Sequence, residues 1–273
     1  MAKKSKIMKI EKEQKLSYWQ AQRKAFLASF SNIAKKGFFK SMLFDLLTLL
    51  TIIIIMNTGI VLVQRMSFEA MPELMKVYDL KQSGDLEAFN SQIAEFMPVI
   101  TRVVGLSLLV AVLAFLLISF FISWWYGKAW CFGLGKKFSA RYLRKYFLLN
   151  IIWFLGWLVL LFLTINIFVT KAAAIVIILE GIFFFYADPV LRAVFNEGKS
   201  IRENFSLFFR TAAKFYWFIF FILVSIILGI ILLLISSIFM KTNVLFLISV
   251  IIFTILFIGW MRNYIIQLVK SIT

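Results

Sequence analysis

The residue best placed to do chemistry is a single acid, Glu180, inside the apolar run at 172–190. It lies about eight residues from each end of that run, near the bilayer middle if the run spans a membrane. An ionised carboxylate at that depth costs several kcal/mol unless it is paired or hydrated. One interpretation is a proton, cation or substrate-amine site. The other, slightly favoured, is a protonated acid hydrogen-bonded between helices, with four candidate partners: Asn57, Asn166, Ser225 or Thr254.

Two further acids, Asp45 and Asp188, lie near the ends of predicted spans. We favour ordinary helix-end interactions at the membrane interface for both. The alternative is a polar cluster in which the two acids meet beside a basic residue, Lys40, Arg192 or Lys214. Asp188 precedes Pro189, and proline disfavours helical geometry in the residue before it. The pair therefore predicts the end of a helix.

The groups that most enzymes and metal sites need are scarce in this sequence. There is no histidine, so the commonest metal ligand and the usual general base at neutral pH are missing. A single cysteine, Cys131, excludes an internal disulfide and a multi-cysteine metal site. We expect no catalytic residues, no metal and no cofactor.

The apolar content requires a membrane. Hydrophobic residues make up 62% of the 273-residue chain and charged residues 16%, against about 25% charged in soluble domains. Six apolar runs predict an all-α polytopic membrane protein, a bundle of six transmembrane helices with amphipathic helices on the cytoplasmic face. The predicted transmembrane domain is 41–268, with spans at about 41–63, 99–125, 147–169, 172–190, 215–239 and 243–266.

The basic residues predict the orientation. With the N-terminus in the cytoplasm, 24 Lys and Arg residues lie on the cytoplasmic side and six on the other. Positive charge is retained in the cytoplasm, so both termini are expected there, in the plasma membrane. The net charge of +17 then reports topology and attraction to anionic lipids, and no nucleic-acid partner is expected.

The segments between the spans predict further helices. Residues 1–40 form a basic arm in which Trp19, Phe26, Phe30, Ile33 and Phe38 recur at helical spacing. This stripe fits a helix on the membrane surface and a helix packed on the bundle equally well. In the external segment 64–98 we expect two short amphipathic helices, separated by a break at Ser83 and Gly84. These helices would either cap the bundle or contact a partner. Capping is favoured.

Three similar segments precede spans one, three and five. Each reads Phe-Ser, then basic residues, then an aromatic pair, at 30–39, 138–147 and 205–216. We expect each to be a basic interfacial helix that leads into a two-span hairpin. The residues expected to contact lipid headgroups are basic and lie on the cytoplasmic side: Lys35, Lys36, Lys136, Lys137, Arg141, Arg144 and Lys214.

The region 183–235 resembles poorly characterised prokaryotic six-span families related to the membrane domain of glycerophosphodiester phosphodiesterases. The resemblance lies in a proline-ended span, an acid, a short helix with a serine, and a basic residue before an aromatic-rich span: Pro189, Glu197, Ser206, Lys214, Phe215 and Trp217. The alanine usual early in the short helix is replaced by Glu203 or Asn204. The resemblance implies a membrane anchor or membrane component, without catalytic residues.

These observations favour a non-enzymatic integral membrane protein. Its expected roles are membrane organisation, lipid interaction or scaffolding of partners from a basic cytoplasmic face, and its expected partners are membrane lipids, preferably anionic, with a membrane protein or a second copy as further candidates. The alternative is a small transporter or channel that uses Glu180. A lipid-modifying enzyme has the least support.

Overall fold

The computed structural model describes residues 17–31, 36–83, 86–168, 170–238 and 243–272, and within these every regular element is a helix. Six helical segments are long and apolar enough to cross a membrane: Gly37–Pro72, Ile93–Leu134, Ala140–Ile167, Lys171–Val194, Phe215–Ser237 and Val244–Ile272. The predicted all-α fold with six transmembrane helices is therefore confirmed, and the protein is a multi-pass integral membrane protein.

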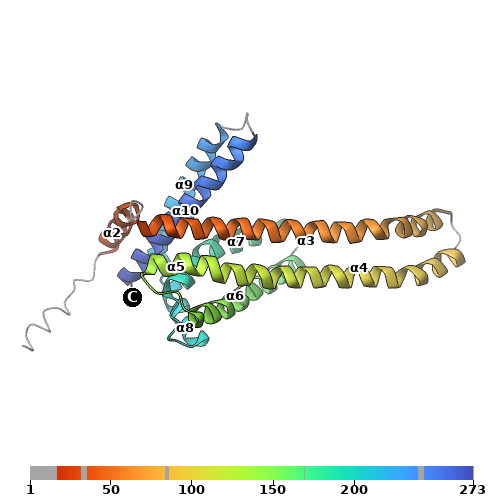
Figure 1. Ribbon diagram of the computed structural model, residues 1–273, viewed down its shortest axis with the longest axis horizontal. Coiled ribbons are helices and arrows are strands. Elements are labelled where there is room, and N and C mark those ends of the chain that lie inside the picture. The colour runs from red at the N-terminus through yellow and green to blue at the C-terminus, as the bar shows by residue number, and fades with distance from the viewer. Residues whose placement is uncertain (1–16, 32–35, 84–85, 169, 239–242, 273) are drawn as a thin grey trace, which may run out of the picture. The chain divides into compact units, whose positions relative to one another are not determined.

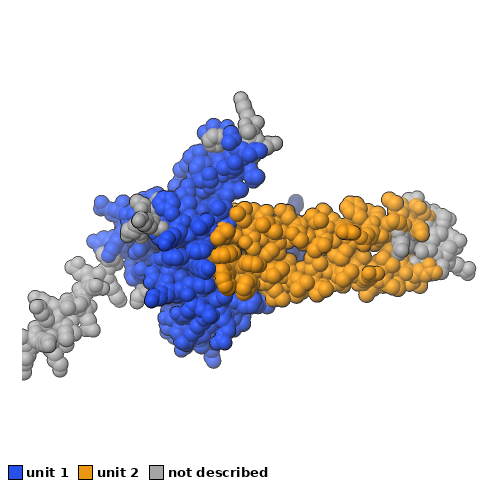
Figure 2. All heavy atoms as spheres, in the orientation of Figure 1, with its two compact units in different colours: residues 1–46, 126–273 blue, residues 47–125 orange. Residues whose placement is uncertain are grey.

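The chain divides into two compact units (Figure 2). Unit 2 comprises residues 47–125, and unit 1 comprises the remainder of the chain. Unit 2 contains most of α3 (Lys36–Ser83), together with α4 (Leu86–Phe121). Each unit has its own internal packing, and the candidate site described below lies within unit 1.

Unit 2 is an antiparallel helical hairpin (Figure 1). The half-buried positions of α3 recur every three or four residues, which is the spacing of one helix face: Ile52, Ile55, Gly59, Val63 and Met66. A Cβ at Gly59 would lie 3.8 Å from Cγ1 of Val110, so this face packs on α4. Most other apolar side chains of the hairpin are exposed, as expected where lipid is the solvent.

The segment 64–98 is helical as predicted, but its helices are not short separate elements, because they continue from the two neighbouring apolar helices. The helix α3 continues through Pro72 to Ser83, and Pro98 lies inside α4. A proline removes one backbone hydrogen bond and bends a helix without always ending it. The predicted break at Ser83 and Gly84 lies at the end of the described part of α3, and Gly84 is outside the described residues.

Unit 1 contains α2 (Tyr18–Ser31), α5 (Gly127–Leu134), α6 (Ala140–Ile167), α7 (Thr170–Val194), α8 (Ile201–Ala212), α9 (Ile219–Ser237) and α10 (Asn243–Ile272). A π-helix (Ile122–Tyr126) precedes α5, and a 3-10 helix (Phe215–Phe218) precedes α9. The core of unit 1 is aromatic. Tyr186, Phe221 and Tyr264 are buried and join α7, α9 and α10.

The described part of the basic arm packs inside unit 1. The stripe that the sequence singled out is buried only in part. Phe38 is 4% exposed and Phe26 is half-buried against the core, Ile33 lies outside the described residues, and Trp19 and Phe30 are 68% and 43% exposed. Small and polar residues of α2 are buried as well, among them Ala21, Gln22 and Ala25. Gln22 donates to the carbonyl of Trp217 and accepts a hydrogen bond from the Tyr264 hydroxyl. Of the two arrangements expected for this arm, α2 therefore has the one in which the helix packs on the protein.

Several helix boundaries differ from the predicted spans. The helix α6 begins at Ala140, where Ser139 caps it by accepting from the backbone N–H of Tyr142. The second Phe-Ser segment is therefore the first two turns of a transmembrane helix and not a separate interfacial helix. In the third segment α8 is separate and strongly amphipathic. The first segment includes residues 32–35, which lie outside the described residues.

Candidate functional site: two buried ion pairs and a basic surface

The most polar part of the interior of unit 1 is a bidentate ion pair on α7. Arg192 Nε lies 2.7 Å from Asp188 Oδ2, and Arg192 Nη2 lies 2.7 Å from Asp188 Oδ1. These residues are four apart on a helix and therefore share a face. The prediction that Asp188 and Pro189 end the helix was wrong, since α7 continues to Val194 with Pro189 inside it.

Three residues on one face of α6 complete this ion pair. Arg192 Nη1 donates to the Tyr146 hydroxyl at 2.6 Å and to Asn150 Oδ1 at 2.8 Å, and Trp153 Nε1 donates to Asp188 Oδ1 at 3.0 Å. The guanidinium also lies 4.9 Å from the ring centroid of Tyr126. A 2% exposed arginine is tolerated because nearly all its donors and its charge have partners.

A second ion pair joins helices far apart in the sequence. Arg262 of α10 donates through Nη1 to both carboxylate oxygens of Asp45, at 2.7 and 2.8 Å, and through Nη2 to the Ser41 hydroxyl at 2.6 Å. Both charged side chains are only 1% exposed. Arg262 Nε has no hydrogen-bond partner among the described residues.

The helices approach each other closely around this second pair. An added Cβ at Gly133 of α5 would lie 2.9 Å from Cδ1 of Ile266. An added Cβ at Gly259 of α10 would lie 2.9 Å from a ring carbon of Phe38. These two glycines allow α5 and the start of α3 to pack against α10, which brings Asp45 within reach of Arg262.

The two predicted acids are thus both paired, but each with its own arginine. Arg192 was one of the three basic neighbours named from the sequence, whereas neither Lys40 nor Lys214 is the partner. Lys214 donates instead to the carbonyl of Ile272 at 3.0 Å. Arg262 was missed because 217 residues separate it from Asp45, and no local pattern connects the two.

Glu180 accepts a hydrogen bond of 2.5 Å from the Thr164 hydroxyl, which links α7 to α6. None of the four partners proposed from the sequence takes part in this bond, because the turn between the two helices brings Thr164 opposite Glu180. The second carboxyl oxygen, Oε2, is buried and has no hydrogen-bond partner among the described residues. The geometry matches the expected interhelical hydrogen bond and leaves one oxygen available.

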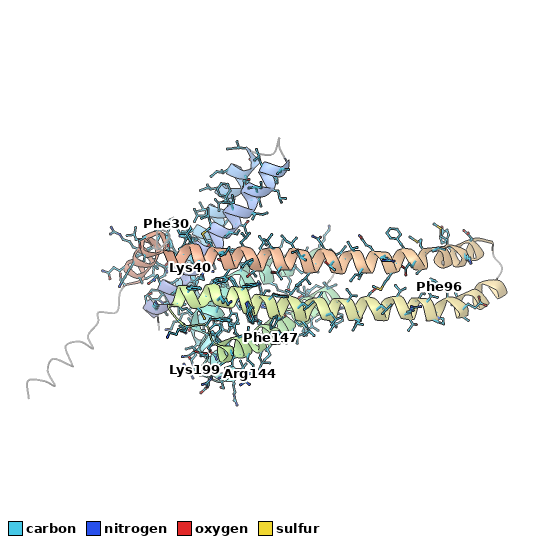
Figure 3. The ribbon with its side chains drawn as sticks, viewed as in Figure 1. Phe30, Lys40, Phe96, Arg144, Phe147 and Lys199 are labelled. Atoms are coloured by element: carbon cyan, nitrogen blue, oxygen red, sulfur yellow. The ribbon has the colours of Figure 1, made fainter. Side chains whose placement is uncertain are left out.

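Four of the predicted lipid contacts, Lys136, Lys137, Arg141 and Arg144, lie just before α6 and in its first turns, where the chain meets the loop between α7 and α8. Lys145 Nζ donates to the carbonyls of Glu197 and Lys199, at 2.8 and 2.7 Å. The Ser139 hydroxyl donates to Glu197 Oε2 at 2.6 Å. Figure 3 labels Arg144 of α6 and Lys199 of this loop.

We call the exposed cations at this end the basic surface, which consists of Lys137, Arg141, Arg144, Arg202 and Arg210. Exposed aromatic rings accompany it on α8 and beyond, with Phe209 62% exposed and Tyr216 57% exposed. Cations beside exposed aromatic rings suit the interface between headgroups and hydrocarbon.

Other predicted contacts are placed differently. Lys136 donates to the carbonyl of Phe195 at 3.0 Å, and partial desolvation lowers the pKa of its ammonium group. Lys136 therefore anchors a loop as well as contributing charge. Lys35 lies outside the described residues, and Lys36 begins α3 without a described side chain.

Comparisons with protein-family models, with curated proteins and with solved structures gave no match. Two features of unit 1 therefore bear on its function. Two buried arginines are neutralised and fix its helices, and an exposed basic surface lies at the start of α6 and on α8.

The second ion pair yields a stability prediction. We expect Arg262→Gln to lower the free energy of unfolding in detergent by about 3–5 kcal/mol, because Asp45 would be left buried without its counter-charge. Replacing both partners, in Asp45→Asn with Arg262→Gln, should cost distinctly less. Thermal and chemical unfolding of the purified variants measures both values, and a double variant as unstable as the single one would contradict this account.

Proposed function

We propose that this protein is a non-enzymatic integral membrane protein that binds anionic lipid headgroups through the basic surface and thereby organises lipids or membrane partners. The observation that carries the proposal is the set of five exposed cations near the start of α6 and on α8, where hydrogen bonds join the start of α6 to the loop between α7 and α8. Cations near an anionic leaflet each contribute about 1 kcal/mol of attraction. The resemblance of 183–235 to six-span membrane components favours the same role.

The exposed cations contrast with the buried ones in a way that supports this role. Arg192 and Arg262 are neutralised by carboxylates inside unit 1, so neither adds attraction at the surface. Within the basic surface, Arg141 and Arg144 are three residues apart and share a face of α6. Their charge is directed to the solvent or headgroup layer, where anionic lipid is the available counter-charge.

We further propose that the protein lies in the plasma membrane and that its basic surface faces the cytoplasm. The 24-to-6 division of basic residues supports this orientation. The connector between α5 and α6 contacts the connector between α7 and α8, as expected of two connectors on the same side of a membrane.

A lipid-retention experiment tests the proposed role. The triple variant Lys137→Gln, Arg141→Gln and Arg144→Gln should retain far less phosphatidylglycerol when it is purified from mixed vesicles, since three attractions of about 1 kcal/mol each are lost. The matched control is Arg65→Gln, Lys76→Gln and Arg102→Gln, which removes the same charge from exposed positions of unit 2. Equal retention by both variants would overturn the proposal.

The orientation has its own test. In a Cys131→Ser background, single cysteines at Ser83 and Ser200 should react with an impermeant thiol reagent from opposite sides of the membrane. Cys131 is 1% exposed in the native protein, so intact wild-type protein serves as the unlabelled control. Labelling of both cysteines from one side would refute the orientation.

The second candidate function is proton-coupled or cation transport through Glu180, which the unpartnered, buried Oε2 atom favours. On this hypothesis Glu180→Gln abolishes a pH-dependent flux in proteoliposomes and leaves the thermal stability unchanged. Thr164→Val is the matched variant, because it removes the hydrogen bond and retains the acid. If both variants only lose stability, Glu180 is a packing residue and transport is excluded as its role.

A further inference from the structure

A surface pocket of about 220 Å³ lies along one face of α8 and is lined by Lys199, Glu203, Ser206, Leu207 and Arg210. Glu203, Ser206 and Arg210 recur every three or four positions and therefore follow one another along one face of α8, and Lys199 lies in the loop just before the cap residue Ser200. From the N-terminal end, the pocket presents a cation, an anion, a hydroxyl group and a second cation. This order of charges defines the kind of ligand that fits.

The anion in this pocket is held in a fixed position. Glu203 Oε2 accepts a hydrogen bond of 2.6 Å from the backbone N–H of Ser200, and the Ser200 hydroxyl accepts one of 3.2 Å from the N–H of Glu203. This capping box orders the carboxylate at the first turn of α8. The backbone hydrogen bond from Ser200 lowers the pKa of Glu203, so the group is ionised at neutral pH and attracts an ammonium group.

The C-terminal end of the pocket has donors suited to phosphate. Arg210 lies in the last turn of α8, one turn after Ser206. A guanidinium beside a hydroxyl is a common phosphate-binding combination. Ser206 and Glu203 are three residues apart, a rise of about 4.5 Å along the helix. A phosphate and an amine joined by a short linker can therefore reach both.

The remaining cation, Lys199, lies four positions before Glu203. It gives the charged lining a net charge of +1, which a purely zwitterionic headgroup would not balance. A ligand with a carboxylate next to its amine would place that carboxylate toward Lys199. Each charged residue of the pocket would then face an opposite charge.

We propose that this pocket binds a phosphoserine headgroup, with the phosphate at Arg210 and Ser206, the amine at Glu203 and the carboxylate at Lys199. The inference rests on the proposed function, because it assumes that α8 lies at the level of the lipid headgroups. It adds a specific site to the diffuse attraction of the basic surface. The exposed ring of Phe209 on α8 suits insertion among acyl chains beside the headgroup.

Binding of short-chain lipids to the full-length protein in detergent, measured by native mass spectrometry, tests the pocket. Dioctanoyl phosphatidylserine should bind about tenfold more tightly than dioctanoyl phosphatidylglycerol, which lacks the amine and the carboxylate. Glu203→Gln should remove this preference while it preserves the helix, because glutamine also completes a capping box. Lys199→Gln should reduce phosphatidylserine binding to the level of phosphatidylethanolamine, which lacks the carboxylate.

The controls separate this site from the wider surface. Arg65→Gln removes an exposed cation outside both the pocket and the basic surface and should leave the preference for phosphatidylserine intact. Displacement by glycerophosphoserine would show that the headgroup alone is recognised, and displacement by the lipid alone would assign the site to membrane-bound ligand. Equal binding of all three lipids by the wild type, or an unchanged preference in Glu203→Gln, would overturn the pocket proposal.

The two proposals can fail separately. Loss of the preference for phosphatidylserine with normal retention of phosphatidylglycerol would refute the pocket alone. Equal retention of phosphatidylglycerol by the triple variant of the basic surface and its matched control would refute the proposed function alone, because the pocket assay reads a preference between lipids that depends on Glu203 and Lys199, which the triple variant leaves unchanged.

Discussion

Neutralisation of two buried arginines is the constraint on which the arrangement of unit 1 depends. A guanidinium removed from water is costly unless a carboxylate and further acceptors surround it. Asp188, Tyr146 and Asn150 meet this requirement for Arg192 and fix α6 against α7. Asp45 and Ser41 meet it for Arg262 and fix the start of α3 against α10. Because lipid provides little hydrophobic drive between helices, such polar contacts help to specify which helices pair.

Burial of these charges also determines what remains for function. Among the basic residues of unit 1, Arg192 and Arg262 form buried ion pairs, and Lys136, Lys145 and Lys214 donate to backbone carbonyls. The cations on the exposed faces of α6 and α8 are left to interact with the surroundings. The same short segments therefore contain cations with partners inside the protein and exposed cations, and the tertiary contacts distinguish the two kinds.

The fold class followed from the sequence because it depends on properties that single residues and short runs carry. Apolar runs of sufficient length must be helical in hydrocarbon, where every backbone donor and acceptor needs an internal partner. Helix ends were less predictable. Pro189 was taken as a boundary, yet it lies inside α7, since the loss of one hydrogen bond is outweighed by continued helix packing and by the ion pair of Asp188 with Arg192 one turn later. If the helix is extended past Pro189, the four-residue spacing of Asp188 and Arg192 predicts this ion pair.

The sequence by itself determined that six helical segments can cross a membrane, that acids lie within them at Asp45, Glu180 and Asp188, and that basic residues concentrate between certain spans. Only the tertiary structure decided the partners of Asp45 and Glu180. Arg262 pairs with Asp45 because Gly133 and Gly259 allow the helices to approach, and Thr164 reaches Glu180 because α6 and α7 are antiparallel neighbours. Such contacts depend on which helix faces meet in space, and the order of residues along a single helix does not contain that information.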